Sequence, residues 1–348
     1  MTTQMAREIA EQPKAARRTL DALLPRRKAA RELFAGRRHV LLVARGSSDN
    51  AAVYGRYLLE AHAGVQSSLA APSVATHYRR RLDLSDTLAV SVSQSGATEE
   101  IIETQAWARS CGAATLAVSN VEGSPLTEQA DLALVTRAGP ELAVPATKTY
   151  LTQLVAMAVI GTALAPDPDS LDEHLDRVVE QVTGRCASGE DLEPAVTLVA
   201  GARTVVAVGR GLMLGTALES ALKLEETTLR ATRGYSYADL RHGPISVVGD
   251  AVTALLVAAP DGPLVEPMTR LAGDLADRGA RVVGVGGSRS FADACSSHLA
   301  GPDLPETLAP LAAIIPVQRL VERVTARLGL DPDAPRGLAK VTQTDAHS

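Results

Sequence analysis

The sequence is poor in several kinds of residue, and each shortage excludes a class of protein. Aromatic residues make up 3% of the 348 residues, so the core must be built from alanine, valine and leucine, as is common where helices cover a parallel sheet. The three cysteines are too far apart for a metal site or a redox pair, and we expect buried thiols. The formal net charge of −5 provides no general basic field, which argues against nucleic acid as a partner.

Long apolar runs are also missing. The N-terminus has no signal-peptide core, and no stretch of about twenty residues is free of charges and helix breakers. The apolar run 155–161 is short, and we expect it to form a buried helix. These absences predict a cytoplasmic protein without a membrane partner. Hydrophobic residues make up 46% and charged residues 22%, which is typical of a globular protein, and the length suggests two domains.

Apolar runs and helical patterns alternate from His39 onward. The runs that we expect to form strands are 40–44, 87–92, 114–118, 132–135, 204–208, 254–257 and 281–285. Alternation of short strands with longer helices predicts an α/β fold with a parallel sheet and helices on both of its faces. The segment 6–34 before this pattern is predicted to be helical, with interruptions near Pro13 and Pro25.

The chain has one clear internal boundary and one internal resemblance. The run 165–169 holds two prolines and two acids between helical patterns, which indicates a linker. The segment 43–60 resembles 208–225, an offset of about 165 residues, which indicates duplication of a domain. We therefore predict a helical arm at 1–38, domains at 39–165 and 166–330, and a C-terminal tail at 331–348 that closes the active site.

Two hydroxyl-rich loops follow predicted strands of the first half: Gly46-Ser47-Ser48 and Ser93-Gln94-Ser95-Gly96-Ala97-Thr98. Ligands of open α/β sheets bind outside the carboxyl ends of the strands. A helix that starts there offers free N–H groups and a positive dipole end, which suit a phosphate. The glycine spacing matches neither a dinucleotide fingerprint nor a P-loop, so a phosphosugar is favoured. For the second loop alone, an ordinary Ser/Thr helix cap is an equal alternative.

The second half carries two groups of ionisable residues. Glu219, Lys223 and Glu226 are spaced by four and three positions on a predicted helix, so they share one face. A surface ladder of ion pairs explains this spacing as well as a catalytic group does. His242 stands in a His-Gly-Pro turn, and an imidazole can transfer protons near neutral pH.

Five blocks in a fixed order carry a resemblance to a known family. They are Ser93-Gln94-Ser95-Gly96, the segment 138–141 followed by 146–148, and the segments 221–226, 240–244 and 335–341. With these blocks the chain resembles the sugar isomerase (SIS) family, in particular the isomerase half of glucosamine-6-phosphate synthase and the stand-alone glucosamine-6-phosphate deaminases. The resemblance implies two tandem SIS domains, each a flavodoxin-like parallel sheet with helices on both faces.

The resemblance also implies a role for each candidate residue. The residues implied to bind the sugar phosphate are Ser48, Ser93, Gln94, Ser95 and Thr98 for the phosphate, and Gly46, Ser47, Val144 and Ala146 for the rest of the substrate. Glu226 would move a proton between C1 and C2, and Lys223 would lie near C1. His242 would assist ring opening from the neighbouring subunit of a homodimer. Lys340 would contact the open-chain sugar or form an imine with it. No metal or organic cofactor is implied.

The departures from the family bear on the reaction. No glutaminase domain precedes the isomerase region, so we expect that the protein does not use glutamine as a source of ammonia. A second departure is Glu225, which stands where the synthase has a lysine. Pro145 and the stretch 233–236 also differ, near the part of the pocket that would contact the C2 substituent. The leading hypothesis is conversion of glucosamine 6-phosphate to fructose 6-phosphate and ammonia. The alternatives are a dehydratase of N-acetylglucosamine 6-phosphate and, third, a phosphosugar-binding sensor.

Overall fold

The computed structural model describes residues 2–340, and it shows an α/β fold with two parallel five-stranded sheets. The chain divides into two compact units. Among the described residues, the A unit comprises 14–141, 148–173 and 339–340, and the B unit comprises 2–13, 142–147 and 174–338. Each unit contains one of the sheets and is described separately.

The sheet of the A unit has the strand order β2-β1-β3-β4-β5, and all its neighbouring strands are parallel. Its strands are β1 (His39–Val43), β2 (Gln66–Leu69), β3 (Thr87–Val92), β4 (Ala114–Ser119) and β5 (Leu132–Val135). Every residue of β3 and β4 is buried, because helices cover both faces of these central strands. This burial explains why the two strands read as continuous runs of apolar and small residues.

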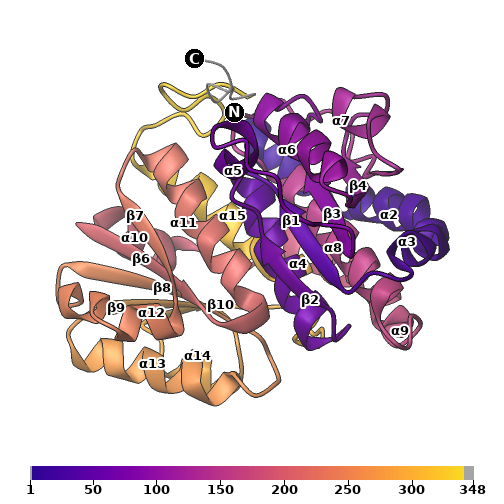
Figure 1. Ribbon diagram of the computed structural model, residues 1–348. Helices are drawn as coiled ribbons and strands as arrows, with labels where there is room; N and C mark the ends of the chain where they lie inside the picture. Colours follow the sequence, from indigo (N-terminus) through magenta and orange to yellow (C-terminus); the bar gives the residue numbers. More distant parts are fainter. Residues whose placement is uncertain (1, 341–348) are drawn as a thin grey trace. The chain divides into compact units, whose positions relative to one another are not determined.

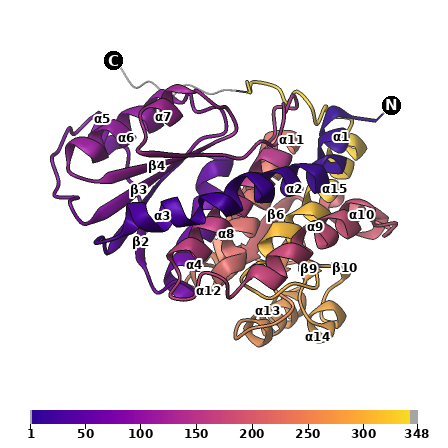
Figure 2. The same ribbon diagram turned by 90° about the vertical axis from the view of Figure 1, so that its right-hand side faces the viewer.

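Helices lie on both faces of the A-unit sheet, as Figure 2 shows. One face is covered by α3 (Arg27–Phe34), α4 (Ser47–Ala61) and α8 (Lys148–Leu164), and the other by α6 (Glu99–Ser110) and α7 (Pro125–Glu128). The A unit also contains most of α2 (Gln12–Leu23), η1 (Leu24–Arg26) and α5 (Ser73–Thr76), whereas α9 (Asp172–Cys186) lies almost wholly in the B unit.

Two glycines allow α4 and α8 to pack closely. A Cβ atom at Gly161 would lie 2.5 Å from Leu58 Cδ2, and one at Gly55 would lie 2.7 Å from Met157 Sδ. Every residue of α8 is buried, so this contact supports α4, the helix that begins at the loop Gly46-Ser47-Ser48.

The sheet of the B unit has the order β10-β9-β8-β6-β7, again with all neighbouring strands parallel. Its strands are β6 (Thr204–Gly209), β7 (Thr232–Ser236), β8 (Val252–Ala258), β9 (Arg281–Gly286) and β10 (Ser297–Leu299). One face carries α10 (Glu193–Gly201), α11 (Leu214–Thr228) and α15 (Pro310–Arg327); the other carries α12 (Tyr237–Arg241), α13 (Val265–Asp277) and α14 (Arg289–Asp293) (Figure 1). Helix α1 (Gln4–Ala10) packs against α15, and two short turns, η2 (Gly211–Met213) and η3 (Pro244–Val247), complete the unit.

The predicted α/β class and the parallel pairing are confirmed, as are the seven predicted strands and the helical segment 6–34. Strands β2, β7 and β10 were not predicted, because they are short, lie at sheet edges and consist largely of polar residues. The tandem division at residue 165 stays a prediction. Residues 341–348 of the predicted tail, and the end of the last resemblance block at Val341, lie outside the described residues.

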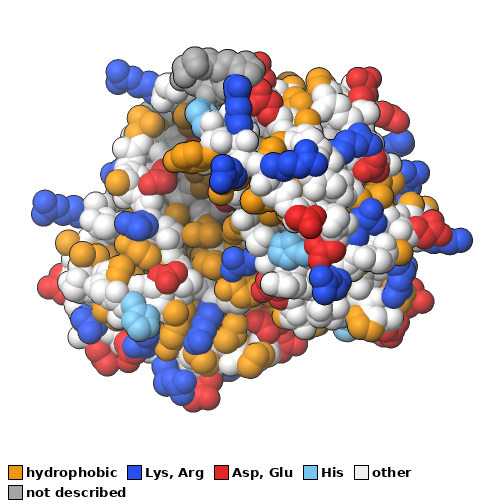
Figure 3. All heavy atoms as spheres, in the orientation of Figure 1, with side chains coloured by type: hydrophobic (Ala, Val, Ile, Leu, Met, Phe, Trp, Pro, Cys, Tyr) orange, Lys and Arg blue, Asp and Glu red, His pale blue; other side chains and the backbone are white. Residues whose placement is uncertain are grey.

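On the face shown in Figure 3, Lys and Arg side chains are interspersed with Asp and Glu side chains and do not gather into one basic field. Among the described residues, none of the helices has both the length and the apolar character that a membrane span requires.

Candidate functional site

The loop between β3 and α6 is held in shape by its own hydroxyl groups. Ser93 Oγ accepts the N–H of Gly96 at 3.2 Å and lies 3.3 Å from Thr98 Oγ1. Ser95 Oγ accepts the N–H of Ala97 at 3.2 Å. Gly96 has φ +62°, and a Cβ atom at this position would lie 2.1 Å from Ser124 Oγ. Only glycine fits both the backbone conformation and the space.

The alternative of an ordinary helix cap does not account for this loop. Thr98 occupies the N-cap position of α6, but its side chain makes no capping hydrogen bond to the helix. Its hydroxyl lies beside that of Ser93 instead. The hydroxyl groups of Ser93 and Ser95 therefore accept N–H groups within the loop, and Thr98 does not close the first helical turn.

The other hydroxyl-rich loop, Gly46-Ser47-Ser48, lies at the same edge of the A-unit sheet. It follows β1, which pairs directly with β3, and both loops leave the carboxyl ends of their strands. Gly46 has φ +57° and precedes α4. Ser48 is buried, and its Oγ accepts a hydrogen bond from Gln153 Nε2 at 2.9 Å. The helix α8, which carries Gln153, thus orients the serine.

An ion pair connects the two loops. Arg45 directly precedes Gly46, and Glu100 lies in the first turn of α6. Arg45 Nε and Nη2 each donate to one carboxylate oxygen of Glu100, both at 2.8 Å. Such a bidentate pair restricts both distance and orientation. Burial raises the pKa of nearby Asp49, and the positive charge of Arg45 opposes this shift.

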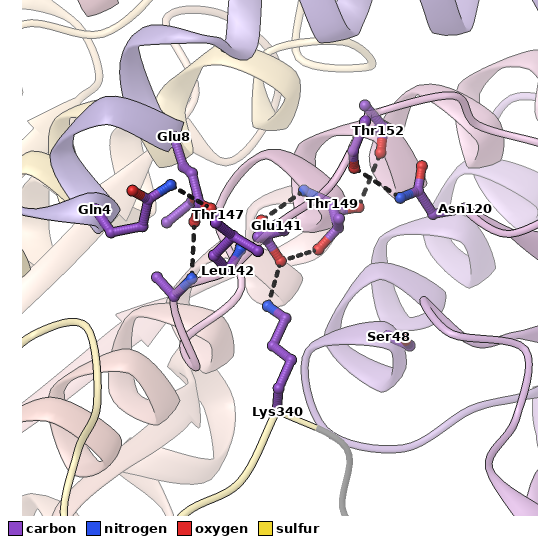
Figure 4. A network of polar contacts seen from close by, with 12 residues as sticks. Gln4, Glu8, Ser48, Asn120, Glu141, Leu142, Thr147, Thr149, Thr152 and Lys340 are labelled. Carbon is purple, nitrogen blue, oxygen red and sulfur yellow. Dashed lines mark hydrogen bonds and ion pairs between the residues drawn. The ribbon is translucent and has the colours of Figure 1, made fainter.

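The C-terminal lysine of the A unit contacts a buried carboxylate, as Figure 4 shows. Lys340 Nζ donates to Glu141 Oε2 at 2.6 Å. Glu141 has no exposed side-chain surface, and it also accepts from the N–H of Thr149 at 3.0 Å and the hydroxyl of Thr149 at 2.5 Å. Burial raises the pKa of Glu141, but the charge of Lys340 and the hydrogen bonds from Lys340 and Thr149 outweigh burial and hold it below its usual value.

In the B unit, Glu219, Lys223 and Glu226 form a cluster on α11. The side chain of Lys223 is 1% exposed, with Nζ 3.5 Å from Glu219 Oε1 and hydrogen-bonded to Glu226 Oε2. Glu219 is 0% and Glu226 22% exposed. The alternative of a surface ladder of ion pairs is therefore wrong, because this face of the helix is buried. Of the two carboxylates of the cluster, only Glu226 has exposed side-chain surface.

His242 is exposed at the end of α12, next to Gly243, which has φ +124°. It lies at a pocket with a volume of about 440 Å³. This pocket is also lined by Arg233, Gly234, Tyr235 and Ser236, so the stretch that departs from the family forms strand β7 beside the histidine. Ser236 Oγ accepts the N–H of Asp239 at 3.1 Å and thereby caps α12, the short helix directly before His242.

Each predicted site residue belongs to one of the two units. The A unit holds Gly46, Ser47, Ser48, Ser93, Gln94, Ser95, Thr98 and Lys340, and the B unit holds Val144, Ala146, Lys223, Glu226 and His242. Within the A unit the two loops share one sheet edge, and within the B unit Lys223 contacts Glu226. The individual roles of these residues stay predictions.

Sequence reasoning missed the partners that hold these residues in place. Arg45 and Glu100 are 55 positions apart, and Glu141 and Lys340 are 199 positions apart. Glu141 belongs to the block 138–141, whose pattern does not indicate a partner for it. Pairing over such distances has no local pattern that could reveal it. In residues 2–340 no group of three or more His, Cys, Asp or Glu residues could hold a metal ion.

Comparisons with known proteins agree with this architecture. The SIS domain family model matches residues 33–163. A glutamine–fructose-6-phosphate aminotransferase (isomerizing) of Methanothermobacter thermautotrophicus is 34% identical over 339 residues, which are 97% of this chain and 56% of the relative. The chain thus spans a little over half the length of such relatives.

Solved structures match over the full length of the chain. A candidate phosphosugar isomerase from Silicibacter pomeroyi aligns with a TM-score of 0.87 and 32% identity, covering 95% of this chain and 100% of that one. Glucosamine-6-phosphate deaminase from Thermotoga maritima aligns with a TM-score of 0.79, covering 98% and 100% of the two chains, but at 22% identity this likeness shows the fold alone. On the family model and the full-length match at 32% identity, the chain belongs to the SIS domain family.

Proposed function

We propose that the protein isomerises an amino sugar 6-phosphate and releases ammonia, converting glucosamine 6-phosphate and water to fructose 6-phosphate and ammonia. The observation that carries this proposal is the Lys223–Glu226 pair on α11, in which a buried ammonium contacts a partly exposed carboxylate. A carboxylate in this setting can act as a base toward a carbon acid, because the adjacent cation stabilises negative charge that develops on the substrate.

The reaction begins with the ring form of the sugar. His242, contributed by a second copy of the chain in a homodimer, assists the proton transfers that open the ring. Glu226 removes the proton from C2 of the open-chain aldehyde and returns it to C1, which leaves an imine at C2. Water adds to this imine and the C2–N bond breaks, giving the ketone of fructose 6-phosphate and ammonia. Every step is a proton transfer or a hydrolysis.

The A unit holds the phosphate end of the substrate in this proposal. The N–H and hydroxyl groups at Ser47–Ser48, the first two residues of α4, and at Ser93–Thr98, directly before α6, supply neutral donors. The ion pair with Arg45 neutralises Glu100, which would otherwise repel a phosphate at this edge. Lys340, whose Nζ donates a hydrogen bond to Glu141, contacts the open-chain sugar in this proposal.

An ammonia assay with purified protein and glucosamine 6-phosphate tests this function. We expect ammonia and fructose 6-phosphate in equal amounts from the unmodified chain, and neither from Glu226→Gln. Glu225→Gln is the matched control, because it makes the same change at the adjacent, exposed position. Absence of ammonia from a folded protein that still binds the sugar phosphate would reject the proposal.

Dehydration of N-acetylglucosamine 6-phosphate is the second candidate. The observation that favours it is the pocket of about 440 Å³ at His242, lined by the divergent stretch Arg233–Ser236. In this reaction Glu226 removes the same C2 proton, and the C3 hydroxyl leaves as water. The product would absorb in the ultraviolet and no ammonia would form. Mass spectrometry of reactions with both sugars separates the two functions, and turnover of neither would favour a phosphosugar-binding sensor.

A further inference from the structure

The segment Leu142–Thr147 has no helix or strand of its own, yet it carries the candidate substrate residues Val144 and Ala146. A loop without regular structure keeps one conformation only if its backbone groups find partners elsewhere. In the B unit these partners come from the N-terminal helix α1, from α15 and from the segment around Asp333.

Glu8 of α1 is the central partner. It is 0% exposed, and its Oε1 accepts the N–H of Leu142 at 2.5 Å while its Oε2 lies 3.3 Å from the donating N–H of Ala143. Gln4 Nε2, one turn earlier on the helix, donates to Glu8 Oε1 at 3.0 Å and orients the carboxylate (Figure 4). A buried carboxylate thus holds two consecutive N–H groups of the loop.

Asp333 holds the next residue of the loop and also the helix. Its carbonyl oxygen accepts the N–H of Val144 at 2.8 Å. Its carboxylate accepts the N–H groups of Gln4 and Met5, both at 2.7 Å. Asp333 therefore connects α1 with the loop. The loop contributes a backbone N–H group to this connection, so a substitution of a loop side chain would not remove the contact.

The far end of the loop is anchored by two buried amides. Gln318 Nε2 on α15 donates to the carbonyl oxygen of Thr147 at 3.2 Å. Gln12 Nε2 donates to Gln318 Oε1 at 2.8 Å, and both glutamines are 0% exposed. Both ends of the loop therefore depend on the N-terminal segment of the chain.

We propose that Glu8 is a positioning residue for the substrate loop, so that the N-terminal helix α1 is a functional part of the sugar-binding site. This inference rests on the proposed function for the contact of Val144 and Ala146 with the sugar. Glu8 does not touch substrate; it fixes the direction of the loop backbone by accepting its N–H groups.

The substitution Glu8→Gln separates this role from simple filling of space. Glutamine has nearly the same shape, but it replaces one acceptor oxygen by an NH₂ donor, which would face a loop N–H group. At least one N–H group of Leu142 or Ala143 then loses its acceptor. Glu11→Gln is the matched control, since it makes the same change at the exposed end of the same helix.

Two measurements on the full chain test the proposal. In the Glu226→Gln background, which is expected not to convert the sugar, titration calorimetry compares the dissociation constants of glucosamine 6-phosphate and of inorganic phosphate with and without the change at Glu8. We expect Glu8→Gln to raise the dissociation constant of the sugar phosphate about tenfold and to leave that of inorganic phosphate unchanged, because the loop contacts the sugar and not its phosphate. Hydrogen–deuterium exchange of the free protein should show exchange at Leu142, Ala143 and Val144 faster by about tenfold or more. Glu11→Gln should change neither quantity.

The outcomes are distinguishable. Unchanged exchange at Leu142 and Ala143, or an unchanged dissociation constant for the sugar phosphate, overturns the proposal. An equal loss for both ligands also overturns it, since that indicates general damage. If the unmodified chain binds no sugar phosphate, the proposed function fails, and exchange alone decides whether Glu8 anchors the loop. If Glu8→Gln does not fold, Asp333→Asn takes its place, because it removes an acceptor from the same network at its other end and is expected to act in the same direction.

Discussion

Lys340 and Glu141, 199 positions apart in the sequence, form a hydrogen-bonded ion pair of 2.6 Å in which the carboxylate is fully buried. The pair attaches the last described residue of the chain to the segment just before α8. A carboxylate buried in this way stays ionised only because the ammonium and two donors from Thr149 surround it.

Glu141→Gln is expected to lower the free energy of unfolding of the A unit by about 1–3 kcal/mol at neutral pH, because charge-assisted hydrogen bonds are lost. The pKa of Glu141 is lowered in the folded state, so its contribution is present above the unfolded pKa and is lost as the pH falls through the folded pKa. The difference between the two proteins should be constant above about pH 5 and shrink below about pH 4.5.

Urea unfolding at neutral pH and below about pH 4.5 measures the difference in free energy of unfolding between the two proteins. The fluorescence of the single tryptophan, Trp107 in the A unit, reports the unfolding. Glu128→Gln, at an exposed position of the same unit, is the control and should change little. Equal stability of Glu141→Gln and the unmodified chain at neutral pH would contradict the assignment.

Glu226→Gln is expected to reduce kcat by about 10²–10⁴-fold with a KM within a few-fold of the original, because the amide cannot accept the C2 proton. Steady-state ammonia release from glucosamine 6-phosphate measures both constants. A large rise in KM with an unchanged kcat would mean that Glu226 binds substrate and is not the base.

Gly96→Ala is expected to destabilise the protein by more than about 1 kcal/mol and to weaken binding of inorganic phosphate. The new Cβ atom would lie 2.1 Å from Ser124 Oγ, and the alanine backbone would have to adopt a φ of +62°. Gly123→Ala is a matched control, since Gly123 has φ +69° but nothing within 4 Å of an added Cβ atom. Thermal unfolding measures the loss of stability and titration measures the affinity for phosphate. Because both substitutions place alanine at positive φ, an additional effect of Gly96→Ala reports the contact with Ser124. Equal effects of Gly96→Ala and Gly123→Ala would argue against a role for the shape of the loop.

Arg45→Met is expected to raise KM about tenfold or more, with the larger effect at low salt, because Glu100 then presents an unneutralised charge beside the phosphate loops. The double variant Arg45→Met/Glu100→Gln removes both charges and should recover most of the affinity. Steady-state kinetics at two ionic strengths provide the comparison. If the double variant binds as weakly as the single one, the pair acts through loop geometry and not through charge.

The local sequence predicted the fold class and the candidate loops for identifiable reasons. Runs such as 87–92 and 114–118 are buried on both faces, and this burial leaves a continuous apolar and small-residue pattern that can be recognised without the structure. Gly46 and Gly96 mark turns because both adopt positive φ. Strands such as β7, with its sequence Thr-Arg-Gly-Tyr-Ser, gave no such signal, since an edge strand needs no apolar run.

The sequence by itself therefore determined seven of the ten strands in the described residues and the two hydroxyl-rich loops that follow β1 and β3, because these features depend on neighbouring residues. Only the tertiary structure decided that Lys223 and Glu219 are buried, that Arg45 joins the two loops, and that Glu8 supports the segment with Val144. These contacts depend on which distant segments pack together. The sequence does not distinguish a solvated carboxylate from one that accepts buried backbone N–H groups. The packing around the carboxylate decides between these two roles.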